Sequence, residues 1–150
     1  MIPRALTPEG VFLVDKPPGP SSFDVVKRLR ERYGVRAGHA GTLDPLASGL
    51  LLCLLGPSTR LARYLVGLDK RYETEIRLGL RTTTGDGEGE VVTLDLHVGS
   101  GTYVRSIADA LGGHCRTLRR LEIGPFSVEE ADETRLIPPA EALARVGVHA

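Results

Sequence analysis

One irregular, glycine-rich segment, residues 38–50, holds the side chains best suited to chemistry. It contains one carboxylate, Asp44, and one imidazole, His39, between two apolar stretches. Because a proline follows Asp44, the backbone of Asp44 is expected to be extended. A carboxylate at the mouth of a buried strand is suited to act as a nucleophile or base. The residues alone leave two interpretations open: a catalytic carboxylate, or a turn aspartate that caps Ala47 or Ser48.

No other common catalytic motif accompanies this loop. The Gly-Lys-Ser/Thr ending of a P-loop is missing, and neither a Ser/His/Asp set nor a metal-ligand spacing is present in the sequence. A lone histidine such as His39 is more often a hydrogen-bonded structural residue than a catalyst. The two cysteines, Cys53 and Cys115, form neither a metal-spaced pair nor a disulfide framework, which favours a reduced, cytoplasmic compartment.

Apolar periodicity and turn residues predict the elements that position the loop. Strands are expected at 11–14, 50–55, 71–80, 91–98 and, more weakly, 115–123. One helix is expected to begin at an N-cap, Ser21 or Ser22, and to stop at Tyr33-Gly34. Further helices are expected at 58–65, 102–111 and 138–146, with Ser58 and Thr102 as N-caps. Residues 36–48 are expected to form no regular element. Because strands and helices alternate without a strict βαβ rhythm, we predict an α+β fold with a mixed or antiparallel sheet flanked by helices.

Length and charge limit the class of protein. A chain of 150 residues predicts one domain, 1–150, and the sequence has neither an apolar run long enough for a membrane helix nor a secretory signal. The 19 basic and 19 acidic residues cancel, but they are segregated along the chain. Basic blocks at 27–36 and 116–120 are compatible with a nucleic-acid-binding face, and a solvated mixed surface is the alternative. We expect a monomer, since nothing in the sequence demands an oligomer.

Five segments, in order along the chain, resemble the motifs of pseudouridine synthases of the TruB type, which modify the T-loop uridine (U55) of tRNA. These segments are 14–22, 38–50, 69–72 together with 78–86, 99–106 and 118–126. The resemblance implies the catalytic core of that family, with tRNA as the partner through its T-arm stem-loop and no metal or cofactor. It extends from about Gly10 to Phe126.

The resemblance also implies roles for individual residues. Asp44 is implied to be the catalytic aspartate of a reaction that breaks the N-glycosidic bond of uridine, turns the base and rejoins it through carbon. Two routes stay open, addition of the carboxylate to the sugar and proton abstraction to give a glycal. Arg105 is implied to pair with Asp44, and a nearby cation favours an ionised carboxylate. The alternative for Arg105 is an arginine on a helix surface.

Substrate contacts complete the expected site. Tyr72 matches the tyrosine that stacks on the flipped base and helps to remove the C5 proton, with a core tyrosine as the alternative. Leu118 matches an apolar residue of the uracil pocket, and His39 matches a histidine that assists flipping. We also expect Arg119 and Arg120 to contact RNA. Lys16 and Pro17 are expected to support the loop without being catalytic, and Arg28 and Arg30 are further candidates for RNA contacts.

The chain departs from the family pattern in length. A long segment between the second motif and the strand before the third is missing, the stretch after Leu111 is abbreviated, and a C-terminal PUA domain has no counterpart. This predicts a minimised or engineered core, or a natural deletion. Because phosphate contacts supply most non-specific affinity, the loss is expected to raise KM first. The alternative functions are a weak or inactive core that binds or remodels the T-arm, and a folded scaffold.

Overall fold

The computed structural model describes residues 8–79, 89–100 and 104–148. Their strands form one mixed sheet of order β1-β3-β6-β4-β5, in which β2 also pairs with β3, and β7 with β6. The strands are β1 (Gly10–Lys16), β2 (Ala37–His39), β3 (Ser48–Leu55), β4 (Lys70–Arg77), β5 (Val91–Val98), β6 (His114–Ile123) and β7 (Phe126–Ser127). Only β3 and β6 pair in parallel, and the other pairs are antiparallel. The predicted α+β fold with a mixed sheet is confirmed.

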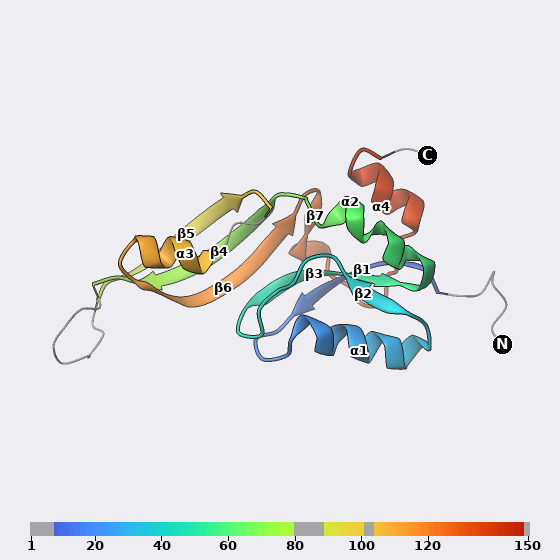
Figure 1. Cartoon of the computed structure of the whole chain (residues 1–150), viewed down its shortest axis with the longest axis horizontal. Coiled ribbons are helices and arrows are strands. Elements are labelled where there is room, and N and C mark those ends of the chain that lie inside the picture. Colours follow the sequence, from blue (N-terminus) through green and yellow to red (C-terminus); the bar gives the residue numbers. More distant parts are fainter. Residues whose placement is uncertain (1–7, 80–88, 101–103, 149–150) are drawn as a thin grey trace.

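Short helices surround the sheet, as Figure 1 shows. They are α1 (Ser22–Tyr33), the 3-10 helix η2 (Gly56–Leu61), α2 (Ala62–Leu65), α3 (Val104–Ala110), the 3-10 helix η3 (Val128–Glu130) and α4 (Pro139–Arg145). At one end of the molecule α1, α2 and α4 surround β1, β2 and β3, and at the other end α3 lies against β4, β5 and β6 (Figure 1). None of the helices among the described residues is long and apolar enough to cross a membrane.

The core lies on both faces of β1 and β3. The run from Leu50 to Leu55 is fully buried, as expected for a strand covered on both faces. Leu50, Leu52 and Leu54 pack in the cluster that includes α4, whereas Leu51, Cys53 and Leu55 pack in the cluster that includes α1. Strand β3 therefore leads directly from the candidate loop into the most buried part of the molecule.

Helix α1 forms as the sequence predicts. Ser21 is its N-cap and forms a capping box with Asp24, and Gly34 ends the helix in the left-handed conformation at φ 65°. Val25, Val26 and Leu29 form the buried face together with Ser22. Phe23, which follows the same helical spacing in the sequence, is instead 57% exposed.

Three local predictions are wrong. Residues 36–48 are not irregular throughout, because β2 pairs with β3. Ser58 is not an N-cap: it lies inside η2, which has no side-chain cap, and its buried Oγ has no partner among the described residues. The two-residue strand β7 was not predicted. Strands β2 and β7 were missed because each is too short to show a hydrophobic periodicity. Each of them forms through pairing with a neighbouring strand. The predicted cap Thr102 lies outside the described residues.

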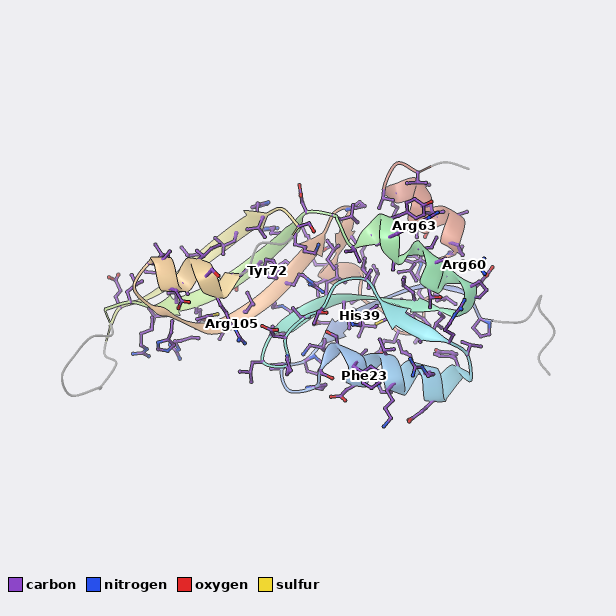
Figure 2. All side chains as sticks on the ribbon, viewed as in Figure 1. Phe23, His39, Arg60, Arg63, Tyr72 and Arg105 are labelled. Carbon is purple, nitrogen blue, oxygen red and sulfur yellow. The ribbon has the colours of Figure 1, made fainter. Side chains whose placement is uncertain are left out.

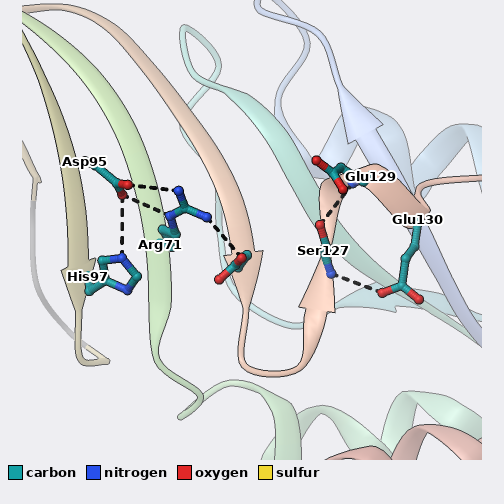
Figure 3. A network of polar contacts seen from close by, with 7 residues as sticks. Arg71, Asp95, His97, Ser127, Glu129 and Glu130 are labelled. Carbon is teal, nitrogen blue, oxygen red and sulfur yellow. Dashed lines mark hydrogen bonds and ion pairs between the residues drawn. The ribbon is translucent and has the colours of Figure 1, made fainter.

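The end of the sheet formed by β4, β5 and β6 is held by cross-strand pairs. β4 and β5 pair over eight residues, from Lys70 opposite Val98 to Arg77 opposite Val91. Arg71 bridges all three strands, with Asp95 of β5 at 2.9 Å and 3.0 Å and Glu122 of β6 at 3.2 Å (Figure 3). The hydrogen bonds from Arg71 lower the pKa of Asp95. On β4, Tyr72, Thr74 and Ile76 form the buried face, as predicted.

Candidate active site

The loop that carries Asp44 is clamped to the segment after β1 by a buried lysine. Lys16 is fully buried, and its Nζ donates to the carbonyl oxygens of Pro20 (2.7 Å), Pro17 (2.9 Å) and Pro45 (3.2 Å). The N–H of Gly19 donates to the same Pro45 carbonyl at 2.7 Å. Burial lowers the pKa of Lys16. The expected supporting role of Lys16 therefore has a direct structural basis.

A second clamp holds the other side of Asp44. The buried hydroxyl of Ser22, in the first turn of α1, bonds both the carbonyl and the N–H of Leu43 at 2.8 Å. The N–H of Ala47 donates to the backbone carbonyl of Asp44 at 3.0 Å and closes a turn. The backbone thus closes this turn, and among the described residues the carboxylate of Asp44 accepts no hydrogen bond from Ala47 or Ser48.

The carboxylate of Asp44 meets a guanidinium from the other end of the molecule. Arg105 lies on α3, and its Nη2 is 3.2 Å from Oδ2 of Asp44. Both side chains are about half exposed, 62% for Arg105 and 49% for Asp44. Exposed ion pairs contribute little to stability. The consequence of this pair is that a negative charge is held in one place with a cation beside it.

Asp44 lines a pocket at the junction of its loop with β4 and β6. The pocket has a volume of about 480 Å³, and Tyr72, Leu118, Lys70 and Arg120 also line it. This volume falls within the range typical of small-molecule sites and suits a nucleoside. Figure 2 shows Tyr72 on β4 and Arg105 on α3 on the same side of the molecule. The structure thus brings together five of the predicted site residues: Asp44, Tyr72, Leu118 and Arg120 line the pocket, and Arg105 pairs with Asp44.

The wall of the pocket is built from Tyr72 and Arg120, which are opposite each other on β4 and β6. Arg120 is only 1% exposed, and it donates to the carbonyls of Leu50 (2.8 Å), Gly41 (3.1 Å) and Thr42 (3.4 Å). The hydroxyl of Tyr72 lies beside the same guanidinium, and burial lowers the pKa of Arg120. Arg120 therefore joins the sheet to the loop before Asp44.

This packing requires a glycine on β3. Gly49 has φ 112°, a conformation that other residues rarely adopt. A Cβ at this position would collide with the backbone of Arg120 on β6. The close approach of the parallel strands β3 and β6 therefore depends on Gly49.

Arg119 and Arg120, both expected to contact RNA, have partners within the protein. Arg120 is buried, and its donors serve backbone carbonyls, so it offers no guanidinium to a surface phosphate. Arg119 makes a two-pronged ion pair with Asp15 at 2.9 Å and 3.0 Å. Arg28, also expected to bind RNA, pairs with Glu133 at 2.6 Å. The sequence of a basic block does not reveal which of its side chains are buried.

His39 lies on β2, outside the lining of the pocket. Its Nδ1 is buried without a partner among the described residues. Burial, followed by the positive charge of Arg120, lowers the pKa of His39. The imidazole is therefore neutral around pH 7, which suits a hydrogen-bonding residue better than a cation.

Sequence reasoning assigned no role to Lys70, which lines the pocket beside Tyr72. Its Nζ donates to the carbonyls of Leu68 (2.7 Å) and Val66 (3.0 Å), and burial lowers its pKa. The sequence could have indicated this position, because residues 70 and 72 of one strand place their side chains on the same face of the sheet.

Comparison with known proteins identifies a matching protein family and several relatives of this chain. A family model described as TruB family pseudouridylate synthase (N terminal domain) matches residues 27–119. The tRNA pseudouridine synthase B of Pelotomaculum thermopropionicum is 57% identical over 83 residues, which make up 55% of this chain and 26% of that protein. The tRNA pseudouridine synthase B of Leifsonia xyli subsp. xyli is 33% identical over 221 residues, covering 89% of this chain and 73% of that protein.

Solved structures share the fold. A chain from an H/ACA ribonucleoprotein bound to a substrate RNA containing 2′-deoxyuridine superposes with a TM-score of 0.71 and 31% identity, over 85% of this chain and 50% of that chain. A pseudouridylate synthase at 19% identity, with a TM-score of 0.66, supports the fold alone. The match spans about a quarter of the Pelotomaculum protein. The Leifsonia comparison extends over 221 residues, more than the 150 of this chain, so that protein has internal residues with no counterpart here.

Proposed function

The chain belongs to the TruB family of pseudouridylate synthases, and on this premise we propose that it converts a uridine in the T loop of tRNA, U55, to pseudouridine. The observation that carries the proposal is the Asp44–Arg105 ion pair beside a pocket lined by Tyr72 and Leu118. These four residues come from separate motifs, and folding assembles them in one place. The proposal treats residues 1–150 as one catalytic domain that works as a monomer in the cytoplasm.

The reaction begins at Asp44. Its carboxylate acts on the ribose of the flipped uridine, either by adding to C1′ or by removing the proton from C2′ to give a glycal. The C1′–N1 bond breaks, the uracil turns in the pocket, and a C1′–C5 bond forms. The C5 proton leaves and N1 is protonated, so the product is an isomer of the substrate. Arg105 places a positive charge 3.2 Å from the carboxylate of Asp44, which holds that carboxylate in position on either route.

The pocket holds the base during this turn. Tyr72 is 8% exposed and presents its ring to the pocket, where it stacks on the uracil. Leu118 supplies an apolar contact on the other strand. Arg120 fixes the hydroxyl of Tyr72 and the loop at Gly41 together, which keeps the distance between base and carboxylate constant.

In this proposal the RNA backbone contacts exposed arginines that have no ion-pair partner among the described residues. Arg36, Arg60 and Arg63 are exposed, and none of them has an ion-pair partner among the described residues. Figure 2 shows Arg60 on η2 and Arg63 on α2, the two helical elements that follow β3. We propose that the T-arm stem-loop crosses this region, with the target uridine in the pocket.

Tritium release from T-arm RNA labelled at uridine C5 tests the proposal, with Asp44→Asn beside the wild type. Wild-type release and none from Asp44→Asn is the expected result, because the amide cannot serve as nucleophile or base. Asp44→Asn should retain its thermal transition and its affinity for the RNA hairpin. Equal release from both proteins would exclude Asp44 as the catalytic group. RNA binding without release from either would favour a binding role.

A further inference from the structure

A second, smaller pocket lies against the candidate active site. It has a volume of about 70 Å³, so it admits a compact group but not a nucleobase. Asp44 and Leu118 line both pockets and form the wall between them. The two pockets therefore adjoin, so a base in the large pocket and a compact group in the small pocket can belong to neighbouring parts of one RNA strand.

The charge of the small pocket is positive. Its charged lining residues are Arg105, Arg116 and Asp44, which leaves one positive charge in excess. Arg105 is neutralised by its ion pair with Asp44. Arg116 is exposed and has no ion-pair partner among the residues that the structure describes. The free charge in this pocket is therefore the guanidinium of Arg116.

An irregularity of β6 directs Arg116 to this place. Glu75 of β4 is opposite Thr117, and the next residue, Ile76, is opposite Cys115, so Arg116 has no partner on β4. Such a bulge re-aims side chains, and bulges are common beside active sites. Arg116 and Thr117, adjacent in sequence, both line the pocket as a result.

We propose that this pocket binds a backbone phosphate of the RNA next to the target uridine, with Arg116 as the principal contact; this rests on the proposed function. An arginine fork matches two phosphate oxygens, which a single ammonium does not. The contact holds the nucleotide on one side of Asp44 while the uracil occupies the other side. Arg116 is thus a substrate-positioning residue that lies outside the base pocket.

A binding titration tests the contact separately from catalysis. Fluorescence anisotropy with a labelled T-arm hairpin is measured over a salt series for the wild type, Arg116→Gln and Arg135→Gln. Arg135 also carries an exposed guanidinium, but it pairs with Glu141 at 3.6 Å and does not line the pocket. Arg116→Gln should raise Kd about 10-fold at low salt and reduce the salt slope by about 0.7 to 0.9, as expected for one lost phosphate contact, whereas Arg135→Gln leaves both unchanged.

Modified hairpins identify the phosphate. A neutral methylphosphonate replaces, in separate hairpins, the phosphate on either side of the target uridine. At one of these two positions, the methylphosphonate should weaken RNA binding by the wild type about as much as the Arg116→Gln substitution does. The same methylphosphonate should not weaken RNA binding by Arg116→Gln any further. The proposal is overturned if Arg116→Gln binds like the wild type, if its loss persists on both modified hairpins, or if the wild type does not bind. Binding of this kind without tritium release would instead count against the isomerase activity and leave the contact intact.

Discussion

The Nζ of Lys16 reaches the carbonyl of Pro45, 29 residues further along the chain, at 3.2 Å. This hydrogen bond connects the end of β1 to the residue after Asp44. Together with the Ser22–Leu43 bonds, it restrains the backbone on both sides of the proposed nucleophile. Positioning residues of this kind contribute to catalysis by keeping a reacting group in its productive geometry, since small displacements are costly.

Replacement of Lys16 by methionine should lower both stability and turnover. The change approximately keeps the length of the buried side chain but removes its three hydrogen bonds to backbone carbonyls, for an expected cost of about 1–3 kcal/mol in the free energy of unfolding. Urea denaturation measures this cost, and single-turnover rates should fall more than RNA affinity. The matched control is Lys27→Met on the exposed surface of α1. A Lys16→Met protein as stable and as active as this control would remove the clamp from the mechanism.

Replacement of Arg105 by glutamine should separate activity from stability. Loss of the partner of Asp44 is expected to reduce kcat about 100-fold, comparable with the loss of one preorganised charge-stabilising group. The free energy of unfolding should change by less than about 1 kcal/mol, because the pair is exposed. Arg135→Gln, which breaks the exposed pair with Glu141, should match it in stability and retain full activity. Wild-type kcat in Arg105→Gln would contradict the assigned role.

Replacement of Gly49 by alanine tests the close packing of β3 against β6. Gly19 is a matched control, because it also has a positive φ, 118° against 112°, but has open space where a Cβ would be. Gly19→Ala should cost about 1–2 kcal/mol in the free energy of unfolding from backbone strain alone. Gly49→Ala carries in addition the collision with Arg120, so its thermal transition should lie well below that of Gly19→Ala. Equal transitions would mean that the two strands separate without cost.

Stability should fall in mild acid because of His39. Its pKa in the folded protein is lowered from the ordinary value of 6.5, so the unfolded chain binds this proton first as the pH falls. The contribution of His39 is therefore complete above pH 6.5 and is lost as the pH falls toward the lowered pKa. Midpoints of urea denaturation, measured between about pH 7.5 and pH 5, test this loss of stability. His39→Asn should flatten this dependence, whereas His114→Asn, at an exposed position of β6, should preserve it. An unchanged slope in His39→Asn would assign it to other groups.

The elements whose stabilising contacts are local were predictable. Ser21, Asp24 and Gly34 delimit α1 through bonds within the helix itself, and the alternation at 91–98 is sufficient to identify β5. The short strand β2 was missed because its hydrogen bonds go to β3, which follows it by about ten residues. A three-residue segment has no periodicity of its own, so only its partner defines it.

The sequence by itself determined the family, the mixed α+β fold and the residue types of the candidate site, since motifs and periodicity are properties of the linear chain. Tertiary structure decided which arginines of a basic block are paired and which are buried, and it supplied the geometry of the Asp44–Arg105 pair that the family resemblance implies. Arg119 and Arg120 are neighbours in one basic block, yet one pairs with Asp15 at the surface and the other is buried against Leu50. Asp44 and Arg105 come within 3.2 Å only because the loop before β3 and helix α3 lie together across the sheet. Burial and ion pairing depend on residues that are far apart in the chain and close in space, and the linear sequence does not state which residues become close in space.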